Sequence, residues 1–182
     1  VDCLHSLCNA HHLRELTRAN EQDKQEWASK MIVLLEELNN AVHDAGGRLD
    51  QTDSEYYRMR YRELLATAEV ECPPPDKNQP TGKRGRVKRS KSRNLLERLI
   101  NFEADVLRFM ENIDIPFTNN QGENDIRMTK VQQKISGCFR SMEGAETFCR
   151  VRGYLSTCRK HGVSSSHAME LLFEGRLPDF AE

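Results

Sequence analysis

The stretch AHHLRELTRANEQDKQEWASKMIVLLEELNNAVHDA, residues 10–45, decides the fold class of this chain. Its apolar residues recur at spacings of three and four through most of the stretch, which is the period of one face of an α-helix. They are Leu13, Leu16, Trp27, Met31, Leu34, Leu35, Leu38 and Val42. Gly46 and Gly47 follow and predict the end of the helix. The pattern therefore favours a mainly α-helical protein.

The same helical pattern returns along the rest of the chain. It predicts helices over residues 53–70, 94–112, 121–135, 144–160 and 165–174. Residues 1–9, VDCLHSLCN, are instead typical of a short strand or an extended segment. We therefore expect at most one or two short strands, near the N-terminus.

Composition and length limit the classes of protein. The chain has 182 residues, enough for one domain or for one long piece of a larger domain, and 30% of them are charged. No run approaches the ~18 apolar residues of a membrane span, and the start has no signal-peptide pattern. We expect a cytoplasmic protein with no membrane partner, whose six cysteines are reduced thiols. Because the first residue is Val, a fragment or a processed chain is expected.

Charge is distributed unevenly. Residues 1–72 hold 8 Lys and Arg against 14 Asp and Glu, whereas residues 73–182 hold 19 against 14. The segment CPPPDKNQPTGKRGRVKRSKSR, residues 72–93, is the clearest linker, and its basic run comprises Lys83, Arg84, Arg86, Lys88, Arg89, Lys91 and Arg93. This run is either a solvated loop or a sequence-independent contact for DNA phosphates. It lacks the aromatic residues that would stack on bases.

The segment PFTNNQGENDIRMTKVQQKISGCFRS, residues 116–141, combines a carboxylate with basic residues. With Asn119 or Asn120 as N-cap, Glu123 falls in the first helical turn, where the helix dipole stabilises a carboxylate. The basic residues that follow on roughly the same face are Arg127, Lys130 and Lys134. Glu123 could bind Mg²⁺ while the basic residues hold a phosphate backbone. The alternative is an ordinary surface ion pair between Glu123 and Arg127.

Three sequence blocks resemble the transposases of the insertion sequence sixty-six family. NNQGENDIRMTKVQQKISGCFRS is similar to that family's run of Asp-Asn-Asn, a variable residue, Ala-Glu-Arg and Asp-Ile-Arg-Met, followed by Lys-Val-Gln-Gln-Lys-Ile-Ser-Gly. LHSLCNAHHLREL resembles its Cys-x-Ala-His-x-Leu-Arg-Glu-Leu block, and SKSRNLLERL its Ser-Lys-x-x-Asn-Leu-Leu-x-Arg-Leu block. The matches keep the family's order and span residues 4 to about 160.

The resemblance implies a DDE-type, ribonuclease H-like nuclease in which two aspartates and a glutamate hold two Mg²⁺ ions. Glu123 matches the glutamate, and the two aspartates would precede residue 1. The chain would then be the C-terminal part of the catalytic domain, residues 1–182. It would comprise an entry strand and helical insertion (1–71), the basic Pro- and Gly-containing linker (72–93) and a helical segment with the catalytic Glu123 (94–182). The implied partners are transposon-end and target DNA, and a second copy of the full-length protein. The resemblance also implies a bacterial protein that associates with the nucleoid.

Three positions depart from the family's pattern: Thr118 replaces Asp, Gly122 replaces Ala, and Asn124 replaces Arg. The alternative function is therefore a non-enzymatic DNA-binding or interaction remnant of a decayed transposase. His11 and Arg14 are further residues that could lie near the active site. Zinc binding through Cys8 and His11, or Cys3 and His5, is an alternative for the N-terminal block, although no distant second pair accompanies it.

Overall fold

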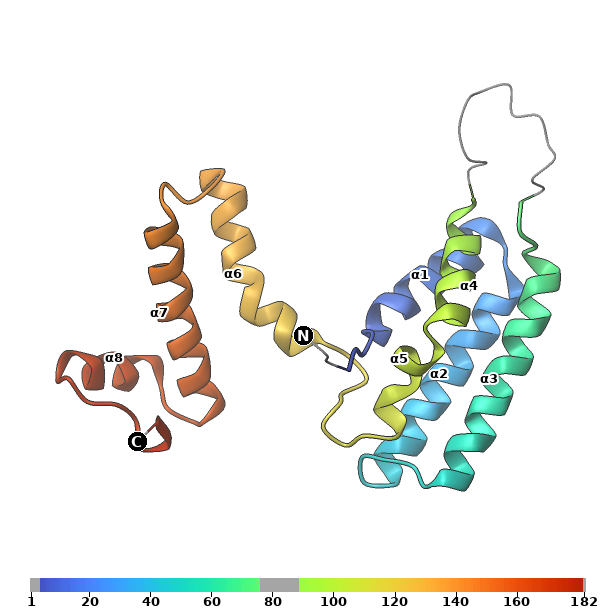
Figure 1. Ribbon diagram of the computed structural model, residues 1–182, viewed down its shortest axis with the longest axis horizontal. Coiled ribbons are helices and arrows are strands. Elements are labelled where there is room, and N and C mark those ends of the chain that lie inside the picture. Colours follow the sequence, from blue (N-terminus) through green and yellow to red (C-terminus); the bar gives the residue numbers. More distant parts are fainter. Residues whose placement is uncertain (1–3, 76–88, 182) are drawn as a thin grey trace. The chain divides into compact units, whose positions relative to one another are not determined.

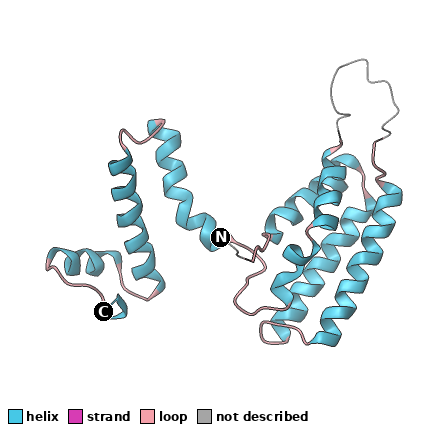
Figure 2. Cartoon of the chain, in the orientation of Figure 1, coloured by secondary structure: helices cyan, strands magenta, loops and turns pink. Residues whose placement is uncertain are grey.

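The computed structural model describes residues 4–75 and 89–181, and helices form all of the regular structure in these ranges (Figures 1 and 2). They comprise eight α-helices and two short 3₁₀ helices, and no strand occurs among the described residues. The mainly α-helical prediction, with at most one or two short strands, is therefore confirmed. The helices gather into two compact units, residues 1–119 and 120–182.

Four helices pack around one core in the first unit. Helices α1 and α3 each lie beside α2 and α4 (Figure 1). The bounds are Asn9–Asp23 for α1, Glu26–Asp44 for α2, Gln51–Glu71 for α3, Lys91–Asn101 for α4, Glu103–Leu107 for α5 and Arg108–Met110 for the 3₁₀ helix η1. Each long helix places its apolar stripe inside, as the spacing of three and four predicts.

The core of this unit is made of large apolar side chains. Its fully buried members include Trp27, Met31, Leu35, Leu96 and Phe109. Burial of each such side chain contributes about 1.5–3 kcal/mol. Tyr61 is buried as well, and its hydroxyl donates a hydrogen bond of 3.0 Å to the Leu99 carbonyl oxygen, which joins α3 to α4.

Residues 10–45, whose apolar spacing predicted one continuous helical stretch, form two helices, α1 and α2. Lys24 adopts a left-handed conformation (φ 56°) and ends α1, and α2 begins at Glu26. The Glu71 carboxylate accepts hydrogen bonds from the backbone N–H groups of Glu26 (2.6 Å) and Trp27 (3.0 Å). These are two of the N–H groups that a helix start leaves without an internal acceptor. A residue 45 positions away in the sequence therefore helps to set the start of α2.

The predicted helix over 94–112 is also divided. It begins at Lys91, where the Ser90 hydroxyl caps α4 by accepting from the Arg93 N–H at 3.0 Å. Phe102 (φ −118°, ψ 30°) separates α4 from α5. Residues 4–8 at the N-terminus form an extended segment rather than a strand, and the Leu7 N–H donates to the Asp105 carbonyl oxygen at 2.9 Å.

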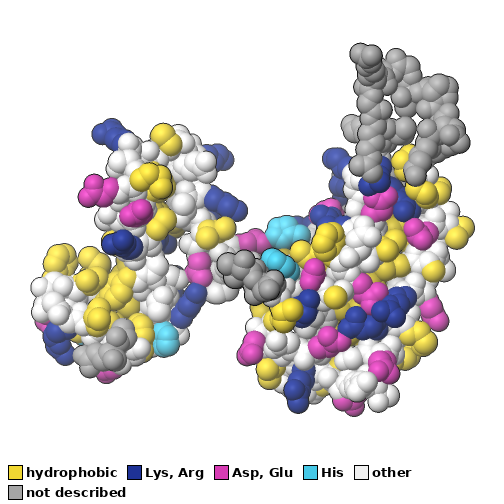
Figure 3. All heavy atoms as spheres, in the orientation of Figure 1, with side chains coloured by type: hydrophobic (Ala, Val, Ile, Leu, Met, Phe, Trp, Pro, Cys, Tyr) yellow, Lys and Arg dark blue, Asp and Glu magenta, His cyan; other side chains and the backbone are white. Residues whose placement is uncertain are grey.

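The second unit contains three helices and little core. Its helices are α6 (Asn120–Ser136), α7 (Met142–Lys160) and α8 (Ser165–Phe173), followed by the 3₁₀ helix η2 (Asp179–Ala181). Helix α7 packs against both α6 and α8. The buried apolar side chains of this unit, among the described residues, are Cys158, Ala168, Leu171 and Pro178. Apolar side chains are visible on the surface of this unit in Figure 3, and Phe173 is 85% exposed.

Candidate functional site

Glu123 lies in the first turn of α6, as its sequence position predicts. Helix α6 begins at Asn120, so Asn119 occupies the position just before the helix. The Asn119 N–H donates to the Cys8 sulfur at 3.2 Å, within the first unit. Arg127, Lys130 and Lys134 follow along α6, and all three are exposed.

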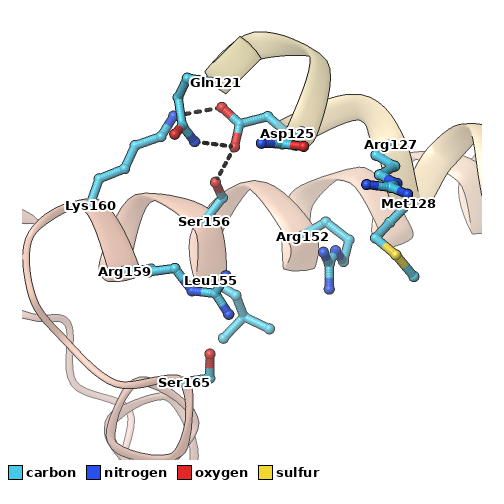
Figure 4. Close-up of a pocket in the computed structure, with 11 residues that line it drawn as sticks. Gln121, Asp125, Arg127, Met128, Arg152, Leu155, Ser156, Arg159, Lys160 and Ser165 are labelled. Carbon is cyan, nitrogen blue, oxygen red and sulfur yellow. Dashed lines mark hydrogen bonds and ion pairs between the residues drawn. The ribbon is translucent and has the colours of Figure 1, made fainter.

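Asp125, two residues after Glu123, joins α6 to α7. Its carboxylate accepts hydrogen bonds from the Ser156 hydroxyl (2.6 Å), the Lys160 ammonium (2.6 Å) and the Gln121 amide (3.2 Å) (Figure 4). The hydrogen bonds from Lys160 and then Ser156 hold the pKa of Asp125 below its ordinary value. The ionised Asp125 carboxylate is therefore part of the contact between α6 and α7.

A pocket of about 540 Å³ lies between α6 and α7 beside this contact (Figure 4). Three arginines line it, Arg127 from α6 and Arg152 and Arg159 from α7. Its other lining residues are Gln121, Asn124, Asp125, Met128, Leu155, Ser156, Lys160 and Ser165. Arg152 and Arg159 are seven residues apart, which is close to two helical turns, so both lie on the same side of α7 as Leu155 (Figure 4).

The remaining predicted DNA contacts have different surroundings. Lys83, Arg84, Arg86 and Lys88 lie outside the described residues. Arg89 forms an ion pair with Glu97 of α4, so its charge is already balanced. His11 and Arg14, the predicted supporting residues, are both exposed on α1.

Arg93, a buried arginine at the end of the basic linker, contacts residues on both sides of that linker. Its guanidinium donates to the Cys72 carbonyl oxygen (2.8 Å), to Glu97 (3.1 Å) and to Glu69 (3.2 Å). The side chain is only 8% exposed. Burial of an arginine is tolerated when carboxylates and carbonyl groups surround it. Arg93 therefore has a structural role, although the sequence placed it in the predicted phosphate-binding run.

The N-terminal block contains a second buried polar contact, between Asn9 and His12. The Asn9 amide donates to the Val106 carbonyl oxygen at 3.0 Å, so its own oxygen faces His12 Nδ1 at 3.0 Å. His12 Nδ1 must then carry the proton, because an amide oxygen only accepts. Burial, and next the charge of Arg98, lower the pKa of His12 to about 4. His12 is therefore a neutral core residue.

Sequence reasoning missed the α7 side of the pocket. Helix α7 carries Phe148, Tyr154 and Leu155 at helical spacing, and the Tyr154 hydroxyl donates to the Ala168 carbonyl oxygen at 2.8 Å. The signal for the pocket was present as Arg152, Ser156 and Arg159 at helical spacing. It could not be assigned without knowing that α6 packs against this side of α7.

Comparison with known proteins places the chain among the transposases. The profile of the family described as "Transposase IS66 family" matches residues 1–147. The chain belongs to this family, and the match includes Glu123 and Arg127.

A relative from Sinorhizobium fredii (strain NBRC 101917 / NGR234), named "Uncharacterized protein y4jO", is 37% identical over 73 residues. That stretch is 40% of this chain and 23% of the relative, so the similarity spans under a quarter of the relative's length. No solved structure matches the chain. Across the described ranges, no helix has the length and apolar character needed to cross a lipid bilayer.

Proposed function

We propose that this chain is part of a DDE-type transposase that cleaves DNA strands and transfers them in a Mg²⁺-dependent reaction. The observation that carries the proposal is the family match over residues 1–147, which includes the segment that begins α6. Glu123 is the proposed catalytic carboxylate, and DNA at the transposon ends and the target is the proposed substrate. A multimer is proposed for the full-length protein, because transposition joins two DNA ends.

We propose that α6 supplies one ligand, Glu123, to the metal site. Glu123 offers a carboxylate, which is a hard oxygen ligand of the kind that Mg²⁺ prefers. Asp125 is held by Lys160, Ser156 and Gln121. The proposed site also needs two aspartates, which the family resemblance assigns to a segment before residue 1. The metal ions would activate the attacking hydroxyl group and stabilise the leaving oxygen at a phosphodiester.

A non-enzymatic DNA-binding remnant is the second candidate. Gly122 and Asn124, which flank Glu123, both differ from the family's usual residues, and Asn124 lines the pocket between α6 and α7. The coding DNA upstream of Val1 separates the two candidates. An open reading frame with two aspartates on predicted strands, or inverted repeats around the gene, supports a transposase, whereas a stop codon supports the remnant.

The direct test uses a protein that joins residues 1–182 to the upstream segment with both aspartates. Glu123→Gln preserves the shape of the side chain and removes its charge. Strand cleavage and strand transfer on labelled DNA should fall by orders of magnitude, while DNA binding changes little. Glu143→Gln is the matched control, since Glu143 also lies in the first turn of a helix, α7, and is exposed. Cleavage that survives Glu123→Gln would exclude Glu123 as the catalytic carboxylate.

A further inference from the structure

The arginines of the pocket between α6 and α7 differ from most arginines of the first unit. Among the described residues, Arg127, Arg152 and Arg159 form no ion pair. In the first unit, by contrast, most arginines are paired with carboxylates: Arg18, Arg58, Arg60, Arg62, Arg89, Arg93, Arg98 and Arg108. Three guanidinium groups that line one pocket without a carboxylate partner give it a positive potential, which favours an anion.

The one carboxylate in the pocket does not serve as that anion. Asp125 binds Lys160 at 2.6 Å and Ser156 at 2.6 Å (Figure 4). Its charge is therefore balanced by the lysine rather than by the arginines. The same contact joins α6, which carries Arg127, to α7, which carries Arg152 and Arg159. The contact of Asp125 with Lys160 and Ser156 therefore leaves the three arginines of the pocket available to bind an anion.

The chemistry of the lining fits a phosphodiester. A guanidinium group donates two parallel hydrogen bonds to phosphate oxygens, and several arginines together hold such groups firmly. Ser165 at the pocket wall is the first residue of α8, and the start of a helix favours an anion. Met128 and Leu155 supply the apolar part of the lining. A volume of about 540 Å³ exceeds that of one phosphate group and leaves room for an adjoining sugar.

We propose that this pocket binds a backbone phosphate of DNA through Arg127, Arg152 and Arg159. The proposal rests on the proposed function for its choice of DNA among phosphate-bearing ligands, but it concerns binding alone. It adds two arginines of α7 to the DNA contacts that the sequence predicts for α6 and for the basic linker. Lys130 and Lys134 are not among the residues that line the pocket.

The test measures binding of the full chain to a fluorescent DNA duplex by anisotropy, over a range of salt concentrations. Arg152→Gln and Arg159→Gln should each weaken binding about fivefold to tenfold near 0.1 M salt and lower the slope of log K against log salt by about 1. Arg150→Gln is the matched control, because Arg150 lies on the same helix, is exposed, and pairs with Glu146 instead of lining the pocket. It should change the affinity less than twofold. Amide resonances of α6 and α7 that remain unchanged in each variant establish that the unit is still folded.

A second arm identifies the source of the phosphate. Inorganic phosphate and a mononucleotide are titrated separately and should bind far more weakly than the duplex. Tight binding of either one, with no duplex binding, overturns the proposal, and so does a duplex affinity that Arg152→Gln and Arg159→Gln leave unchanged. None of these results depends on strand cleavage, so the Glu123→Gln experiment tests the proposed function independently.

Discussion

The buried His12 makes the stability of the first unit sensitive to acid. His12 is 3% exposed, and its pKa is about 4 in the folded chain against an ordinary value of 6.5. The groups that act on its charge are Arg98 and His11, which lower the pKa, and Glu15, which raises it. Because the unfolded chain binds the proton more tightly, stability is complete above about pH 6.5 and falls as the pH drops toward 4.

The two pKa values give the size of the effect. Between pH 7 and pH 5 they predict a loss of about 2 kcal/mol in the free energy of unfolding, from this one residue. Most carboxylates remain ionised over this interval, so His12 should dominate the change. His12→Gln removes the titrating group and keeps an N–H donor for the Asn9 side-chain oxygen. The variant should therefore lose about 2 kcal/mol less than the wild type over the same interval.

Urea unfolding followed by tryptophan fluorescence is the appropriate assay. The chain has one tryptophan, Trp27, which is 1% exposed in the core of the first unit, so the signal reports on that unit. His43→Gln is the control, because His43 is an exposed histidine of the same unit. The reasoning would be refuted if the free energy of unfolding fell by the same amount from pH 7 to pH 5 in the wild type and in His12→Gln.

Two further predictions follow from the turn after α2 and from the contact between α6 and α7. Gly47→Ala should destabilise the first unit more than Gly46→Ala in the same fluorescence assay. The reason is that a Cβ at Gly47 (φ +109°) would lie 2.8 Å from Ile113 Cγ1, whereas Gly46 (φ +78°) has open space and should cost about 1 kcal/mol. Equal losses would contradict this. Asp125→Asn should accelerate amide hydrogen exchange in α6 and α7 without moving the Trp27 unfolding midpoint, because it removes the ion pair to Lys160. Unchanged exchange would show that this contact does not hold the two helices together.

The helices were predictable from the sequence because their apolar spacing is local information. The stripe from Trp27 to Val42 identifies the buried face of α2, and serine before α4, α7 and α8 marks where each begins. The break at Lys24 was not predictable in this way. No glycine or proline marks it, and the Glu71 carboxylate that caps α2 comes from the end of α3.

In the candidate site too, local sequence predicts some residues, and others become apparent only from the packing of the helices. Glu123 and Arg127 were predictable because both lie in one helix beside a family motif. Arg152 and Arg159 are unremarkable in the sequence, and they gain their significance only because the Asp125 contact places α6 beside α7. Arg89 and Arg93 show the converse, since the sequence left their basic run as either a solvated loop or a phosphate contact, and both are paired with Glu97. A basic run specifies charge, but not which of its members already has a carboxylate neighbour.

The arrangement around Arg93 bears on how the first unit could be divided. Arg93 binds the Cys72 carbonyl oxygen and Glu69 at the end of α3, and Glu97 within α4. The junction of these helices is thus held by contacts between described residues on both sides of the linker. A polypeptide cut between residues 76 and 88 would leave α1–α3 and α4–α5 with a shared apolar core and this polar junction intact. The unit is therefore suited to fragment complementation, with two separately produced halves that reassemble, and the same position should accept an inserted reporter domain.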